Sequence, residues 1–117
     1  MIIIVLPNFI PKSLNVLFAM NHWKRAAYKK EVSELVGWLC KGQTIEPIVG
    51  PIDIHFTFQF KAKRNRDMDN FIGGAKFIID GLKDAGIIPD DNSDIVKSIT
   101  VQFKKGSKEQ TIIKLKL

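Results

Sequence analysis

The stretch IDIHFTFQF, residues 52–60, decides the fold. Its apolar side chains alternate with Asp53, His55, Thr57 and Gln59 without a break. Successive side chains of a strand point to opposite faces, so this alternation predicts a half-buried β-strand. One face of the strand would join a core. His55 would lie on the polar face, and we expect it to be an ordinary surface histidine.

A strand and a helix are predicted before this central strand. Residues 1–6 form a continuous apolar run stopped by Pro7, which predicts a buried strand. Residues 7–21 are rich in turn-forming side chains, which favours an irregular loop. Apolar residues then recur at helical spacing over 22–40, and 42–50 is a connector.

Three further elements follow the central strand. A second helix is predicted over residues 68–84, and two strands over 95–103 and 110–117. The Lys-Gly-Ser-Lys segment at 105–108 favours a hairpin turn between these strands. The element order is β-α-β-α-β-β. We therefore predict a single α+β domain over residues 1–117, with two helices packed on a largely antiparallel sheet.

Composition narrows the class of protein. A chain of 117 residues with 45% hydrophobic residues suits one small domain with a modest core. The single cysteine, Cys40, cannot form an internal disulfide, and we expect it to be a small buried residue. A reducing, cytoplasmic location follows as an expectation. The apolar run at the start is too short to span a membrane, so no membrane partner is expected.

The chain is basic, with a net charge of +6 that favours an anionic partner such as nucleic acid. Four of the six residues at 61–66 are cationic and directly follow the central strand. They form either a solvated loop or a clamp for phosphate groups. A second cationic group lies in the first half of the helix over 22–40, and its members are Lys24, Arg25, Lys29 and Lys30.

Acidic residues open the second helix, in Asp67-Met68-Asp69-Asn70. Helix capping explains one acid there, whereas two carboxylates and an amide also suit Mg²⁺ or Mn²⁺. At about 100° per residue, Lys76 and Asp80 fall within about 20° of Asp69, opposite the apolar face of the helix. This stripe is either a solvated surface with an i,i+4 ion pair or part of a site.

A second acidic pair lies in Pro89-Asp90-Asp91-Asn92, a sequence typical of turns. If this turn folds back toward the start of the second helix, Asp91 would complete a three-carboxylate site with Asp67 and Asp69. Sequence spacing leaves both interpretations open.

Together these motifs resemble the signature of the RusA family of Holliday junction resolvases. In that signature Asp-x-Asp-Asn is followed by Lys, by Asp-Ala-Leu or Asp-Gly-Leu, and by a later Asp-Asp. The matching segments here are 67–70, Lys76, 80–82 and 90–91. The segment PKSLN at 11–15 is similar to the family's Pro-x-Ser-x-Asn loop.

The resemblance implies a Mg²⁺-dependent endodeoxyribonuclease that acts in recombination and repair. It would bind four-way and related branched DNA as a homodimer and make paired cuts. The implied metal-site carboxylates are Asp67, Asp69 and Asp91, with Mn²⁺ as a substitute ion, and Lys76 is the implied catalytic lysine. The residues expected to follow the DNA backbone are Lys61, Lys63, Arg64, Arg66, Lys24 and Arg25.

One departure from the family pattern concerns the lysine. The better-known form of the family places it three residues after the Asn, where this chain has Gly73. Lys76 keeps the family's four-residue spacing to the downstream Asp. We therefore expect the extra residues to form a bulge or loop around Gly73 and Gly74, which would bring Lys76 back toward Asp69.

Two other functions are compatible with the same residues. One is a non-catalytic nucleic-acid-binding module, in which the acidic residues serve only as caps and turns. The other is a Mg²⁺ enzyme that acts on nucleotides, although the chain has no Gly-rich phosphate loop of the Walker type. Metal-dependent cleavage of DNA would separate the endonuclease from the binding module.

Overall fold

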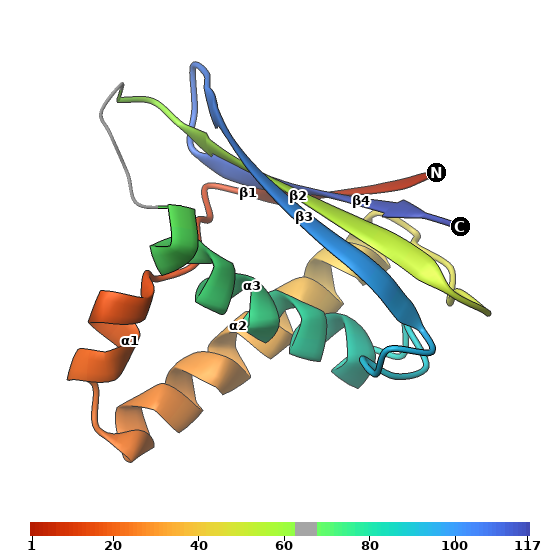
Figure 1. The fold of residues 1–117 in the computed structure, drawn as a ribbon, viewed down its shortest axis with the longest axis horizontal. Coiled ribbons are helices and arrows are strands. Elements are labelled where there is room, and N and C mark those ends of the chain that lie inside the picture. Colours follow the sequence, from red (N-terminus) through yellow and green to blue (C-terminus); the bar gives the residue numbers. More distant parts are fainter. Residues whose placement is uncertain (63–67) are drawn as a thin grey trace.

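The computed structural model describes residues 1–62 and 68–117, which form a sheet with helices beneath it (Figure 1). The seven elements, in chain order, are β1 (Ile2–Pro7), α1 (Leu14–Ala19), α2 (His22–Gly42), β2 (Ile52–Phe60), α3 (Met68–Asp84), β3 (Val96–Lys105) and β4 (Gln110–Lys116). The predicted α+β class and the order β-α-β-α-β-β are confirmed, with α1 as an additional short helix.

The four strands lie in the order β1-β4-β2-β3. β4 pairs antiparallel with both β1 and β2, whereas β2 and β3 run parallel. The sheet is therefore largely antiparallel, as predicted. β2 occupies a central position, with a strand partner on each edge, and its apolar side chains are buried.

The predicted hairpin between the last two strands is wrong, because β2 lies between β3 and β4. Their connection crosses the end of β2 and folds over Gln59. The Gln59 amide donates to the carbonyl of Lys108 at 2.9 Å, and the Gly106 N–H donates to the carbonyl of Phe60 at 2.9 Å. Gln59, beneath this connection, is buried, and so is Thr57, although the alternation had placed both on an open polar face.

A helix also replaces part of the loop predicted over residues 7–21. Ser13 caps α1 by accepting a hydrogen bond from the Val16 N–H at 3.5 Å. The preceding residues are fixed by α2, since the Tyr28 hydroxyl accepts from the Lys12 N–H at 2.9 Å. A helix of six residues is too short to produce a recognisable apolar period, which explains why the pattern missed it.

The core lies between the sheet and the helices α2 and α3. β2 contributes every second side chain from Ile52 to Phe60, and all five of these apolar side chains are buried. Cys40 is also buried, as predicted, and burial raises the pKa of its thiol to about 11. No helix in the described part of the chain combines the length and apolar character of a membrane span.

Candidate active site

Helix α3 carries three of the side chains singled out in the sequence, namely Asp69, Lys76 and Asp80. The helix is continuous from Met68 to Asp84, so the bulge expected at Gly73 and Gly74 is wrong. Asp69 is exposed in its first turn, and Lys76 lies two turns further on, a rise of about 10 Å. The departure from the family spacing is therefore not repaired by a local loop.

The two glycines have a different role, which is close packing against the segment before α1. A Cβ atom on Gly74 would lie 2.7 Å from Cβ of Pro11 and 2.8 Å from the carbonyl oxygen of Lys12. A Cβ atom on Gly73 would overlap the side chain of Leu14. The segment resembling the family's Pro-x-Ser-x-Asn loop thus packs directly on α3, one turn from Lys76.

Asp80 is buried rather than part of a solvated stripe, because α2 packs beside α3. Its side chain is 12% exposed and is shared by two lysines. Nζ of Lys76 lies 3.4 Å from one carboxylate oxygen, and Nζ of Lys29 lies 3.7 Å from the other. Asp80 therefore joins Lys76 to the cationic first half of α2.

The turn after α3 holds Asp91 in a defined place. The Asp91 N–H donates to Oδ1 of Asp90 at 2.7 Å, and the Asn92 amide donates to Oδ2 of Asp90 at 3.1 Å. The hydrogen bonds from Asp91, and the hydrogen bond and charge of Lys83, lower the pKa of Asp90 below its ordinary value. The Pro-Asp-Asp-Asn sequence thus forms a turn closed by its own side chains.

Lys83 is the residue that the sequence interpretation missed. Its Nζ lies 3.3 Å from Asp90 and 3.7 Å from Asp91. The hydrogen bond with Asp90 and the charges of both acids raise the pKa of Lys83. No local pattern could reveal this contact, because it connects the last turn of a helix to a turn that folds back against it.

The same turn brings Asp91 to the hollow that Lys76 lines. This hollow, of about 370 Å³, lies between α3 and β3. Apart from Lys76 and Asp91 it is lined by small and apolar residues: Ile72, Gly73, Ala75, Ile79, Val96 and Ile99. The predicted lysine and one predicted carboxylate therefore line the same hollow, whose other lining residues are small or apolar.

The remaining predicted metal ligands are only partly covered by the structure. Asp67 lies outside the described residues, and Asp69 does not line the hollow. Among residues 1–62 and 68–117 there is no group of three or more side chains of the metal-ligating kind. The three-carboxylate set thus stays a prediction. Its donors are of the type that Mg²⁺ prefers. In the described part of the chain, the Asp91 carboxylate lies beside Lys83 and also interacts with Asp90.

The cationic residues fall into two groups. Lys24 and Arg25 are exposed in the first turn of α2, where Arg25 also donates to the carbonyl of Met20 at 3.0 Å. Lys61 is exposed just after β2. The other predicted DNA-contacting residues, Lys63, Arg64 and Arg66, lie outside the described residues.

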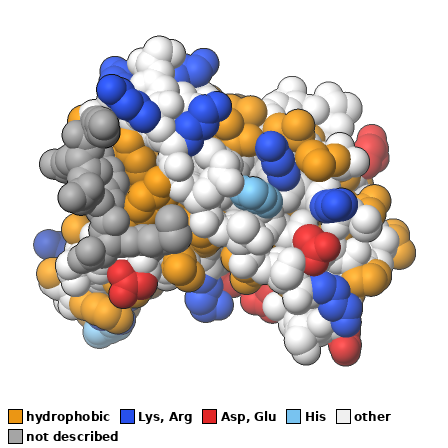
Figure 2. Space-filling view, turned by 45° about the horizontal axis from the view of Figure 1, so that its top comes forward, with side chains coloured by type: hydrophobic (Ala, Val, Ile, Leu, Met, Phe, Trp, Pro, Cys, Tyr) orange, Lys and Arg blue, Asp and Glu red, His pale blue; other side chains and the backbone are white. Residues whose placement is uncertain are grey.

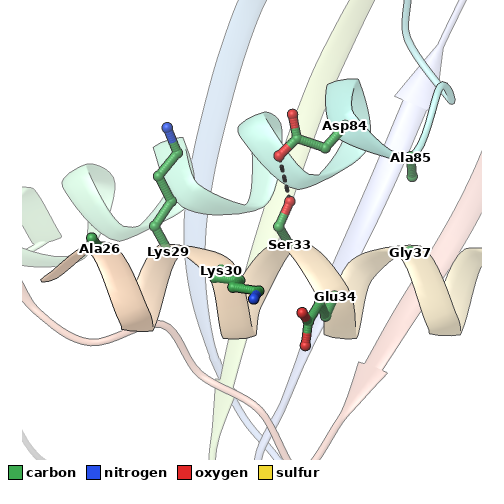
Figure 3. Close-up of a pocket in the computed structure, with 8 residues that line it drawn as sticks. All are labelled: Ala26, Lys29, Lys30, Ser33, Glu34, Gly37, Asp84 and Ala85. Atoms are coloured by element: carbon green, nitrogen blue, oxygen red, sulfur yellow. Dashed lines mark hydrogen bonds between the residues drawn. The ribbon is translucent and has the colours of Figure 1, made fainter. Parts of the chain in front are cut away.

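A second hollow, of about 500 Å³, runs between α2 and α3 on the outer side of the helices (Figure 3). Figure 3 shows Ser33 and Asp84 facing each other across it, where the Ser33 hydroxyl donates to Oδ2 of Asp84 at 2.6 Å. Lys29, on its rim, also reaches Asp80. The helices approach closely at Gly81, where a Cβ atom would lie 3.0 Å from Cβ of Val36. This approach explains the glycine of the Asp-Gly-Leu motif.

No protein-family model matches the chain, and no curated protein matches it either. Function is therefore inferred from the arrangement of these side chains.

Proposed function

We propose that the protein is a RusA-like, Mg²⁺-dependent endodeoxyribonuclease that resolves four-way and related branched DNA in recombination and repair. The observation that carries this proposal is that Lys76 and Asp91, from a helix and from the turn after it, line the same hollow. A lysine and a metal-binding carboxylate at one hollow are an arrangement suited to cleaving a phosphodiester.

In this proposal Asp67, Asp69 and Asp91 hold Mg²⁺, for which Mn²⁺ can substitute. The ion supplies a polarised water and positive charge for the phosphate oxygens. Lys76 places its ammonium group beside the scissile phosphate and offsets the negative charge that grows there. Asp80 holds this ammonium group in position, and its second partner, Lys29, leaves the trio with one surplus positive charge.

The cationic residues at the start of α2 and after β2 would hold the DNA backbone. Contacts of this kind position a duplex without reading bases, which suits recognition of a branched shape. We further propose a homodimer, because two-fold symmetry sets two sites on opposed strands of a four-way junction. The apolar side chains available for such an interface include Phe18 and Trp23, which are 71% and 75% exposed.

A non-catalytic DNA-binding module is the second candidate, and one observation favours it. Both key side chains already have partners, since Lys76 pairs with Asp80 and Asp91 with Lys83. Paired in this way, the acidic residues of the turn could serve structure alone.

The deciding experiment is cleavage of a labelled four-way junction, a flap and a plain duplex. We expect cuts in the branched substrates with Mg²⁺ and none with EDTA, while binding persists in both. Cleavage that ignores EDTA would contradict the metal-dependent mechanism. Binding of all three substrates without any cleavage would favour the second candidate.

A further inference from the structure

The sheet has a second face, which no described helix covers (Figure 1). Figure 2 shows this face turned toward the viewer, with lysine side chains gathered around a histidine. The strand registers identify the row. His55 of β2 lies beside Lys114 of β4 on one side and Thr100 of β3 on the other.

The ring nitrogen Nε2 of His55 is buried without a hydrogen-bond partner among the described residues. Because Nε2 lies below the surface, a ligand on this face would contact the other atoms of the imidazole ring. The imidazole also lines a hollow of about 390 Å³ on this face, together with Lys114 and Thr100.

The charges around this hollow favour an anion. Lys114 and Lys116 supply two positive charges against one carboxylate, that of Asp53. Asp53 lies in the neighbouring row, opposite Lys116, and its Oδ1 accepts a hydrogen bond from the Ser98 hydroxyl at 2.6 Å. The row of Lys114, His55 and Thr100 contains a cation, an imidazole and a hydroxyl, and no acid. Side chains in one row are about 5 Å apart, so all three can reach one tetrahedral anion.

We infer that the open face of the sheet binds a DNA phosphate at the row of Lys114, His55 and Thr100. The inference rests on the proposed function for the identity of the ligand. A polymer fits better than a free ion, because a further lysine, Lys104, lies on the same face beyond the uncharged row that contains Thr57. Lys104 pairs with Gln59, two rows from His55 and about 13 Å away. A DNA strand places several phosphates within that distance.

The first test uses inorganic phosphate as the probe and the histidine ring signals in NMR as the readout, at constant pH and ionic strength. We expect saturable shifts of the His55 signals, with half-saturation on the order of 1 mM. His22, exposed beside Lys24 and Arg25 in the first turn of α2, is the internal reference for general surface association, and its signals should shift less than those of His55. The variant His55→Gln assigns the signals, and Lys114→Gln with Lys116→Gln should abolish the shifts. An unmoved His55, or equal shifts at His22, would overturn the site.

The second test measures duplex affinity and its salt dependence for the double variant Lys114→Gln, Lys116→Gln. We expect affinity to fall at least about fivefold and the salt slope to decrease by about two. Lys41→Gln, which removes an exposed cation from the helical layer, should change neither.

Two results distinguish this inference from the proposed function. Normal duplex affinity in the double variant, while wild type cleaves junctions, would overturn the assignment to DNA and leave the endonuclease intact. Phosphate binding at His55 by a protein that binds no DNA would overturn the proposed function and the DNA assignment together.

Discussion

The close approach at Gly74 gives a prediction that needs no assumption about function. Alanine normally stabilises a helix interior by about 1 kcal/mol relative to glycine. At Gly37, in α2, this gain should appear, because a new Cβ atom would lie 3.8 Å from Cβ of Ala85, an ordinary contact. At Gly74 the new atom would lie 2.7 Å from Cβ of Pro11 and 2.8 Å from a backbone oxygen, neither of which can rotate away. Overpacking of this kind costs about 1–3 kcal/mol.

The pair of variants therefore separates helix propensity from packing. We expect Gly37→Ala to raise the free energy of unfolding by up to about 1 kcal/mol. Gly74→Ala should lower it by about 1 kcal/mol, because overpacking exceeds the propensity gain. Gly73→Ala should fall between them, since the flexible Leu14 side chain can move. Urea unfolding measures the difference directly, and thermal melts should differ by about 8 °C. If Gly74→Ala stabilises the protein as much as Gly37→Ala, the packing explanation of the glycine pair is wrong.

Three further predictions concern the site and the core. Asp91→Asn removes a proposed metal ligand and should slow junction cleavage by more than about a hundredfold. Junction binding should stay intact, because the turn keeps its Lys83–Asp90 ion pair. Near-normal cleavage would show that Asp91 is not part of the metal site. Lys76→Ala should reduce cleavage by a similar factor with affinity within about threefold, while Lys41→Ala changes neither; normal cleavage would make Lys76 a surface residue paired with Asp80. Cys40 should resist thiol reagents in the native protein and react on unfolding, since burial keeps its thiol protonated; rapid native labelling would contradict its burial.

The helix α3 and the strand β2 could be predicted from the sequence, because each depends on a pattern of neighbouring residues. Alternation over 52–60 and helical spacing over 68–84 each determine which side chains share a face, and the structure has both elements with these bounds. The strand order was not accessible in this way. A Lys-Gly-Ser-Lys turn is compatible with a hairpin, whereas the insertion of β2 between β3 and β4 depends on pairing between segments far apart in the sequence.

In the candidate site, too, residues could be predicted from the sequence where the evidence is local, but not where it depends on how the chain folds. Lys76 and Asp91 were identified as residue types in a spacing, and the structure places both at one hollow. Lys83 was missed because its contacts with Asp90 and Asp91 depend on how the turn folds back. The glycine pair was assigned to the wrong cause for a similar reason. Two glycines permit an irregular backbone or a close approach equally well, and only the packing partner decides between them.

The distribution of charge around the hollow gives it a polarity that no single residue shows. Lys76 and Lys29 share one carboxylate, that of Asp80, so this group keeps one surplus positive charge. Lys83 faces both Asp90 and Asp91, so that group keeps one surplus negative charge. Lys76 and Asp91 present these opposite charges to the same hollow. A phosphate group beside a divalent cation has the matching polarity, since the cation would lie toward Asp91 and the phosphate oxygens toward Lys76. The ion pairs of Lys76 with Asp80 and of Lys83 with Asp91 thus also determine the orientation in which the proposed substrate would bind.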